Sequence, residues 1–287
     1  MPLKVNIDRH SGFCFGVRKA IELADEILSR EDQLYCLGEI VHNSAETIRL
    51  EKRGLKTISY NDFKKLKDTS VFVRAHGEPP ETFNIARENN LTLINATCPV
   101  VTKLQQKVRT SMQNQNNRQM VIYGKKGHPE VIGLCGHAYN KAIVIEELGD
   151  IESLPTNKNI ILYSQTTMNG NSFDEFAEKI KERLQDGLSL EIKNSICGAV
   201  SNRIPILAQF AGENDLILFV AGKTSSNGRM LYETCKTINQ NIHYLSDADD
   251  IKPQWFKNNS TVGVCGATST PQWLIQKVAD TVKDLDI

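Results

Sequence analysis

The 287-residue sequence lacks the features that would place it in several common classes of protein. Its longest apolar run, LILFVAG at 216–222, is far too short to cross a bilayer. The first ten residues, MPLKVNIDRH, contain no apolar signal region. Basic and acidic residues both number 34, so no net charge attracts the chain to nucleic acid or to an anionic membrane. We therefore expect a cytoplasmic globular protein that holds any anionic ligand through local chemistry.

Motifs for nucleotide cofactors are missing as well. No GxGxxG follows the first expected strand, and GKTSSNG at 222–228 lacks the first glycine of the phosphate-binding pattern GxxxxGK[ST]. The sequence thus carries no signature for a flavin or a nicotinamide. Any electrons that the protein uses would come from an external donor.

The seven cysteines contain no CxxC pair, which disfavours zinc ribbons and thioredoxin-type redox sites. An odd number of cysteines in a chain without an export signal also argues against a disulfide framework. Four of them lie inside or at the end of expected strands and helices, where a cysteine is usually a small buried apolar residue. These expected structural cysteines are Cys36, Cys135, Cys235 and Cys265.

The other three cysteines share one arrangement, in which an expected strand ends at a cysteine that opens an expected helix. The strands are KVNID, LTLINAT and LSLEIKNSI, and the helices are GVRKAIELADEIL, PVVTKLQQKVRTSM and GAVSNRIPILAQFA. Between each strand and its helix lie Cys14, Cys98 and Cys197. Their nearly equal spacing along the chain indicates an internal repeat.

Two further strand–loop–helix units follow each cysteine, and polar residues stand at the strand ends. The second units place His42, His128 with Glu130, and Ser225 with Ser226 and Asn227. The third units place His76, Thr166 and Ser269. This order predicts an α/β fold of three pseudo-threefold-related modules, over residues 14–97, 98–196, and 197–287 with 1–13.

Ligands of open α/β sheets bind outside the carboxyl ends of the strands, where all of these residues lie. Three thiolates without a fourth leave an open coordination position, as in a catalytic zinc site or a [4Fe–4S] cluster with one free iron. The imidazoles, hydroxyls and amide form a set of hydrogen-bond donors suited to a phosphate or diphosphate. Glu130, at a helix start beside His128, is suited to donate a proton.

Nine short motifs spread over nearly the whole chain resemble those of the LytB family, the 4-hydroxy-3-methylbut-2-enyl diphosphate reductases. They are GFCFGV, EIVHN, AHG, ATCPVVTK, GHPEV, SQTT, SIC, SSN and TSTP. The resemblance implies a trefoil of three α/β modules around a central [4Fe–4S] cluster. It also implies the last step of the non-mevalonate isoprenoid pathway, a two-electron reductive removal of the allylic hydroxyl that gives isopentenyl and dimethylallyl diphosphates.

The resemblance further implies a role for each candidate residue. The cluster ligands would be Cys14, Cys98 and Cys197, with one open iron. The residues that bind the substrate would be His42, His76, His128, Thr166, Ser225, Ser226, Asn227 and Ser269. Proton delivery would depend on Glu130, Thr166 and His128. A ferredoxin- or flavodoxin-type protein would supply electrons one at a time.

Two other functions remain open from the residues alone. A three-cysteine cluster enzyme similar to quinolinate synthase would act as a dehydratase without net electron transfer. A cluster protein that senses or carries electrons would leave Glu130, Thr166 and the set of donors without a role, and the sequence favours it less.

Overall fold

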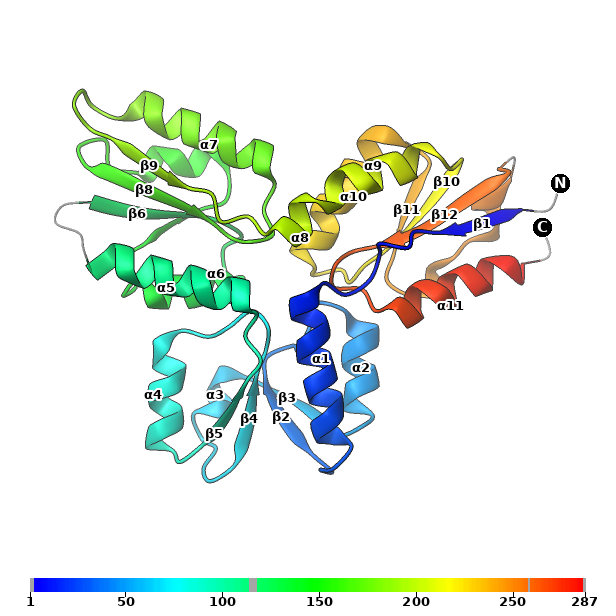
Figure 1. The fold of residues 1–287 in the computed structure, drawn as a ribbon, viewed down its shortest axis with the longest axis horizontal. Coiled ribbons are helices and arrows are strands. Elements are labelled where there is room, and N and C mark those ends of the chain that lie inside the picture. Colours follow the sequence, from blue (N-terminus) through cyan, green and yellow to red (C-terminus); the bar gives the residue numbers. More distant parts are fainter. Residues whose placement is uncertain (1–2, 114–117, 258, 286–287) are drawn as a thin grey trace. The chain divides into compact units, whose positions relative to one another are not determined.

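The computed structural model describes residues 3–113, 118–257 and 259–285, and within them the chain is an α/β protein with three four-stranded sheets (Figure 1). Neighbouring strands run parallel, as between β1 and β12 or β8 and β9. The strands are β1 (Lys4–Ile7), β2 (Leu34–Leu37), β3 (Leu55–Ile58), β4 (Ser70–Val73), β5 (Thr92–Asn95), β6 (Arg118–Tyr123), β7 (Ile143–Ile145), β8 (Asn159–Ser164), β9 (Leu190–Lys193), β10 (Leu216–Val220), β11 (Ile242–Leu245) and β12 (Thr261–Gly266). The predicted α/β class and its three sheets are confirmed.

The helices alternate with these strands along the chain. They are α1 (Phe15–Leu28), α2 (Ser44–Glu51), α3 (Tyr60–Phe63), α4 (Pro80–Glu88), α5 (Pro99–Gln113), α6 (Pro129–His137), α7 (Gly170–Arg183), α8 (Gly198–Ser201), α9 (Arg203–Gly212), α10 (Ser226–Ile238) and α11 (Gln272–Lys283), with 3₁₀ helices η1 (Leu148–Ser153), η2 (Ala248–Asp250) and η3 (Pro253–Phe256). Among the described residues no helix is both long and apolar enough to cross a membrane.

All three sheets have the same strand order, which is the strongest structural sign of a repeat. The orders are β3-β2-β4-β5, β7-β6-β8-β9 and β11-β10-β12-β1. One edge of each sheet is β3, β7 or β11, and the other edge is the strand that leads directly to Cys14, Cys98 or Cys197. Each predicted module range contains the strands of one sheet.

The chain divides into two compact units that differ from the predicted modules. Unit 1 comprises residues 1–33, 39–56 and 198–287, and unit 2 comprises residues 34–38 and 57–197. Helices α1 and α2 belong to unit 1, whereas β2, β4 and β5 belong to unit 2 and β3 is divided between the two units. A salt bridge with a 2.7 Å N–O distance joins Asp25 of α1 to Arg49 of α2 within unit 1.

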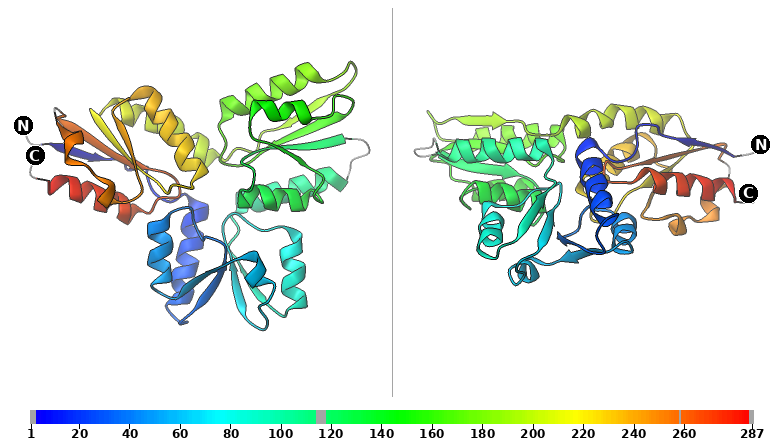
Figure 2. Two further views of the ribbon diagram at one scale, coloured as in Figure 1. Left: turned by 180° about the vertical axis from the view of Figure 1, so that it is seen from behind. Right: turned by 60° about the horizontal axis from the view of Figure 1, so that its bottom comes forward.

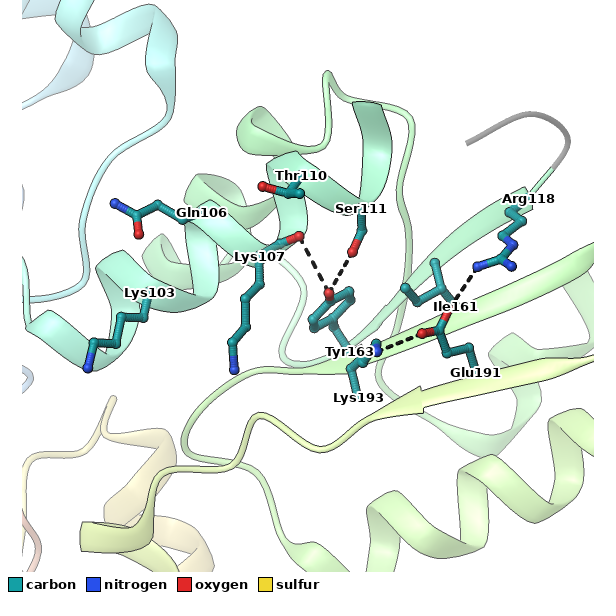
Figure 3. Close-up of a pocket in the computed structure, with 10 residues that line it drawn as sticks. All are labelled: Lys103, Gln106, Lys107, Thr110, Ser111, Arg118, Ile161, Tyr163, Glu191 and Lys193. Atoms are coloured by element: carbon teal, nitrogen blue, oxygen red, sulfur yellow. Dashed lines mark hydrogen bonds and ion pairs between the residues drawn. The ribbon is translucent and has the colours of Figure 1, made fainter. Parts of the chain in front are cut away.

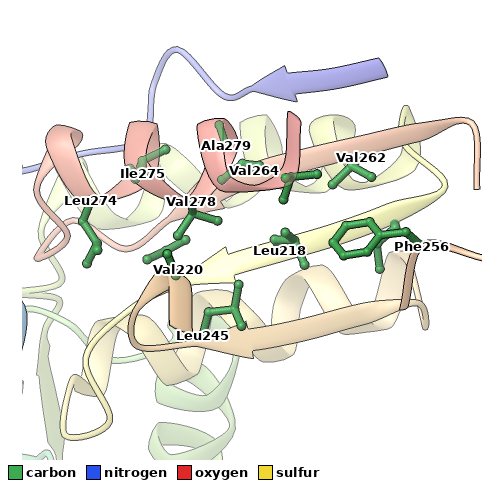
Figure 4. Packing of buried hydrophobic residues seen from close by; sticks show 13 residues of the cluster. Leu218, Val220, Leu245, Phe256, Val262, Val264, Leu274, Ile275, Val278 and Ala279 are labelled. Carbon is green, nitrogen blue, oxygen red and sulfur yellow. The ribbon is translucent and has the colours of Figure 1, made fainter. Parts of the chain in front are cut away.

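Unit 1 contains the sheet β11-β10-β12-β1, which helices cover on both faces. One face packs against α11, where Leu218, Val264 and Val278 are fully buried (Figure 4). The other face packs against α9 and α10 through residues such as Phe219 and Leu231. Burial on both faces explains why β10 is a continuous apolar run, since a strand with one exposed face would alternate apolar and polar residues.

Unit 2 contains the sheet β7-β6-β8-β9 and most of the sheet β3-β2-β4-β5. In the sheet β7-β6-β8-β9, alternate residues of β6 point to opposite faces, so Val121 packs toward α7 and Met120 toward α5 and α6. The views in Figure 2 agree that α7 lies on one side of this sheet and α5 on the other. The sheet β3-β2-β4-β5 has a smaller core, in which Phe63 of α3 packs with Val71 of β4.

One expected helix is wrong in its extent. The sequence predicts a continuous helix over residues 198–211, but the structure divides it at Asn202 into α8 and α9. Pro205 explains the break, because it has no amide hydrogen to donate to the carbonyl four residues earlier and its ring crowds that carbonyl.

Candidate functional site

The three repeated cysteines have the same backbone anchor. Each cysteine follows the edge strand of a sheet, and its amide donates a hydrogen bond to a carbonyl in the loop after the neighbouring strand. The donors Cys14, Cys98 and Cys197 pair in turn with the carbonyls of Thr268, Ala75 and Thr166, at N–O distances of 3.0, 3.0 and 2.9 Å. Each bond lies within one unit, so both units fix their cysteines in the same local way.

Burial separates these three cysteines from most of the others. They are half-buried, whereas Cys36, Cys235 and Cys265 are fully buried. Burial raises the pKa of the Cys36 thiol to about 12, which keeps it protonated at neutral pH. Cys135 is half-buried too, but it lies inside helix α6 and burial raises its pKa. The repeated cysteines therefore differ from the other four more clearly in their position after an edge strand than in their burial.

A buried network that the sequence analysis missed holds the loop before Cys14. The Ser11 hydroxyl donates to Asp8 Oδ2 at 2.7 Å and accepts a hydrogen bond from the Gly266 amide at 2.8 Å. Arg203 donates to the same Asp8 oxygen at 2.7 Å. Gly12 follows with φ of +124°, a conformation that a residue with a side chain rarely adopts. The local signal for this network is Arg203 itself, which carries the single charge in the segment RIPILAQFAG.

Unit 2 brings Glu130 and Thr166 together. The amide of Thr166 donates to Glu130 Oε1 at 2.7 Å, and its hydroxyl donates to Oε2 at 2.8 Å. Glu130 is 2% exposed, and this burial raises its pKa to about 7, with the two hydrogen bonds from Thr166 acting in the opposite direction. The carboxyl group can therefore hold a proton near neutral pH.

Unit 2 also brings His76 and His128 together. Their rings meet edge to face with centroids 5.3 Å apart. Nδ1 of His128 accepts a hydrogen bond from the Glu130 amide at 3.2 Å, so the proton of the neutral ring is on Nε2, which is a donor. Next to His76, Gly77 has φ of +70°, and a Cβ atom there would come within 2.5 Å of the Gln105 side chain.

Unit 1 brings together the serines and the asparagine of the donor set. Ser225 caps helix α10 by accepting a hydrogen bond from the Gly228 amide, and its hydroxyl lies 3.0 Å from that of Ser269. Oδ1 of Asn227 accepts from both the amide and the hydroxyl of Thr268, at 3.0 and 2.7 Å. Its buried Nδ2 has no partner among the described residues. An amide group held by its oxygen, with an unused donor, is well suited to an anionic ligand.

The segment of His42 packs against the same part of unit 1. A Cβ atom on Gly222 would lie 2.1 Å from the His42 carbonyl oxygen, so only glycine fits there. Gly222 directly precedes the loop with Ser225, while Asn43 caps helix α2 by accepting from the Glu46 amide. Ser226 is half-buried at the first position of α10.

The described contacts thus join three pairs of candidate residues. Those pairs are Glu130 with Thr166, His76 with His128, and Ser225 with Ser269. The functional roles of these residues remain predictions. Asp8, Ser11 and Arg203 are additions to the predicted set.

Comparisons with known proteins give a consistent result. A model of the family described as LytB protein matches residues 5–283. The chain is 49% identical over 283 residues to the 4-hydroxy-3-methylbut-2-enyl diphosphate reductase of Bacteroides fragilis, with 98% of each chain covered. It is 43% identical over 306 residues to the reductase of the same name from Chloroherpeton thalassium, covering 98% of this chain and 96% of that one.

Two solved structures agree with these sequence relatives. One, described as (E)-4-hydroxy-3-methyl-but-2-enyl diphosphate reductase, the terminal enzyme of the non-mevalonate pathway, is 33% identical. Its TM-score is 0.72 over 99% of this chain and all of that one. The other, E-1-hydroxy-2-methyl-but-2-enyl-4-diphosphate reductase from Plasmodium falciparum, is 29% identical with a TM-score of 0.87 over 100% of this chain and 90% of that one. The chain belongs to the LytB protein family.

Proposed function

We propose that this protein reduces 4-hydroxy-3-methylbut-2-enyl diphosphate to isopentenyl and dimethylallyl diphosphates, the last step of the non-mevalonate pathway. The reaction breaks the allylic C–O bond and consumes two electrons and two protons. One proton leaves with the hydroxyl oxygen as water, and the other ends on a carbon atom of the product. The observation that carries this proposal is the buried Glu130–Thr166 pair, because this carboxyl group can hold a proton at neutral pH.

We further propose that Cys14, Cys98 and Cys197 hold a [4Fe–4S] cluster with one open iron. The residues fit such a group, since three half-buried cysteines share the same kind of backbone anchor and the donor set is all sulfur. When bound, such a cluster would supply electrons and, at the open iron, a Lewis acid. The trefoil of three modules, over residues 14–97, 98–196, and 197–287 with 1–13, belongs to the same proposal.

The chain's own residues would supply the proton. Glu130 is buried without a basic side chain that forms an ion pair with it among the described residues, so its protonated form is favoured. Thr166 holds both carboxyl oxygens and so fixes their direction. Because the Glu130 amide donates to Nδ1 of His128, the carboxylate and the imidazole are connected through the first turn of α6.

Two of the proposed donors to the diphosphate are His76 and His128 of unit 2, the latter through Nε2–H. In unit 1 the free amide group of Asn227 is the best-defined donor, because its oxygen is fully used by Thr268. The remaining donors of the proposal are His42, Thr166, Ser225, Ser226 and Ser269.

The electrons would come from a separate protein of the ferredoxin or flavodoxin type, in the cytoplasm. The need for a donor protein is inferred from the reaction, which consumes two electrons, and from the lack of flavin and nicotinamide motifs in the sequence.

Anaerobic purification followed by an iron and sulfide assay tests the proposal first. We expect about four irons per chain and oxidation of reduced methyl viologen only when the hydroxymethylbutenyl diphosphate is added. Cys98→Ser should lose the cluster absorbance, whereas Cys135→Ser, also half-buried but inside α6, should keep it. A cluster without substrate-dependent oxidation would refute the reductase function, and an intact cluster in Cys98→Ser would refute the ligand set.

A further inference from the structure

A basic groove runs along unit 2 between helix α5 and the edge strand β9. Two adjoining cavities of about 600 and 410 Å³ form it, and they share Lys103, Lys107, Tyr163 and Lys193 as lining residues. Figure 3 shows Lys103 and Lys107 on the helix, with Glu191 and Lys193 on the strand opposite. We call it the α5–β9 groove.

The charge of the groove is strongly positive in a protein that has no net charge. Four basic side chains line it, namely Lys103, Lys107, Arg118 and Lys193, against the single acidic residue Glu191. Glu191 binds Arg118 at 2.8 Å and Lys193 at 2.6 Å. Lys103 and Lys107 form no ion pair with any residue that the structure describes. Their two charges are therefore available to a partner.

Apolar residues lie at the end of the groove nearer the cysteines. Val100 is 42% exposed and Ile192 is 49% exposed, and both line the smaller cavity. An exposed apolar patch with a charged rim is typical of protein–protein contact surfaces. The floor is fixed, because the buried Tyr163 hydroxyl lies 2.8 Å from that of Ser111 on α5.

The groove leads toward two of the three repeated cysteines. Helix α5 begins at Pro99, directly after Cys98, and β9 ends at Lys193, four residues before Cys197. With a rise of about 1.5 Å per residue, Lys103 and Lys107 lie roughly 7 and 13 Å along the helix from Cys98. A partner bound in the groove would sit close to the thiols that receive electrons in the proposed reaction.

We propose that the α5–β9 groove is the docking surface for the acidic face of the electron-donor protein. This proposal rests on the proposed function, which requires a donor but does not say where it binds. The argument for this occupant is charge complementarity. Lys103 and Lys107, together with the partly neutralised Arg118 and Lys193, would attract carboxylates of the partner. Val100 and Ile192 would supply a small apolar contact. Nucleic acid is disfavoured, because the groove is short and the rest of the chain adds no net positive charge.

The variant K103E/K107E tests the groove without touching residues of the proposed catalytic site. Binding of an acidic ferredoxin, measured by titration of the cluster-loaded protein, should weaken at least about tenfold, since rim charges govern association. The KM for ferredoxin in substrate reduction should rise by a similar factor. Raising NaCl from about 0.05 to about 0.3 M should weaken the wild-type complex and have little effect on the variant.

Two controls separate docking from catalysis and from net charge. Turnover driven by reduced methyl viologen, a small reductant that needs no docking surface, should stay within about twofold of the wild type. The variant K158E/K181E makes the same charge change on the same unit, at exposed residues before β8 and on α7, and should bind ferredoxin as the wild type does.

Three results would overturn the proposal. Unchanged ferredoxin binding by K103E/K107E would place the docking surface elsewhere. An equal loss of ferredoxin binding in K158E/K181E would show that the effect comes from net charge and not from the groove. A single-stranded DNA oligonucleotide that bound the wild type more tightly than ferredoxin, and not the variant, would identify a nucleic-acid groove. Failure of the proposed reaction is seen separately, as a wild-type protein that binds ferredoxin but does not oxidise methyl viologen with substrate.

Discussion

Glu130 in unit 2 and Asp8 in unit 1 are both buried carboxyl groups, 2% and 3% exposed, but their surroundings are opposite. Asp8 binds the guanidinium of Arg203 at 2.7 Å, so its negative charge is neutralised. Glu130 receives two hydrogen bonds from Thr166 and no ion pair from the described part of the chain, and burial raises its pKa to about 7. Burial alone therefore does not assign a role: the paired group holds a loop, and the unpaired group can exchange a proton.

The largest expected effect comes from removing the proton of Glu130. Glu130→Gln should lower methyl-viologen-driven turnover by roughly 10²–10⁴-fold, the usual contribution of a general acid, and leave the cluster absorbance unchanged. The amide has nearly the same shape but cannot donate a proton of the required acidity. Wild-type turnover should fall as the pH rises through about 7, because the active form is the protonated one. Near-normal turnover of the variant would remove Glu130 from the mechanism.

The next largest effect comes from breaking the ion pair between Asp8 and Arg203. Arg203→Met leaves the Asp8 carboxylate buried without a cation, and the free energy of unfolding should fall by about 3 kcal/mol. Urea unfolding of the cluster-free protein measures this loss. The exposed pair between Arg30 and Glu26 provides the control, since Arg30→Met should cost no more than about 0.5 kcal/mol.

A second substitution checks that the loss in Arg203→Met comes from the charge of Asp8. Adding Asp8→Asn to Arg203→Met should recover part of the stability, because the buried group is then neutral. A double variant that is less stable than Arg203→Met would contradict this account, as would equal losses for Arg203→Met and Arg30→Met.

The smallest effect sharpens the comparison by altering only one hydrogen bond. The Thr166 hydroxyl stabilises the ionised form of Glu130, so it lowers the pKa against the effect of burial. Thr166→Val removes that bond and should raise the pKa further, by about one unit. The pH at which turnover is half lost should then move upward. A downward shift in the pH profile would show that the hydroxyl stabilises the protonated form instead.

Much of the fold was predictable because strands and helices have different apolar periods. The element order and the position of Cys14, Cys98 and Cys197 at strand ends follow from local patterns. The place of those strands at sheet edges follows only from the pairing of the strands. The grouping of α1 and α2 with unit 1 does not follow from local patterns, because it depends on long-range contacts such as the hydrogen bond from Trp273 of α11 to Glu46 of α2. The break at Asn202 was visible in principle through Pro205.

The site was predictable where both the residue type and its place at a strand end indicated a functional role. Glu130, Thr166 and the histidines have such local signals, and the sequence could name them without their distances. The Asp8–Arg203 pair joins residues 195 apart in sequence, so no local pattern would reveal it, although Asp8 also accepts a hydrogen bond from nearby Ser11. The pKa of Glu130 was unpredictable for the same reason, since burial is a property of the packed chain.

The three cysteine amides bond to main-chain carbonyls, and that choice has an evolutionary consequence. A hydrogen bond between two backbones is insensitive to which side chains stand beside it, so each copy of the repeat could change its amino acids while keeping its cysteine in place. This explains why the three copies share an order of elements but little sequence identity. The repeat is therefore preserved in the order of its elements and in backbone geometry more than in the identity of its residues.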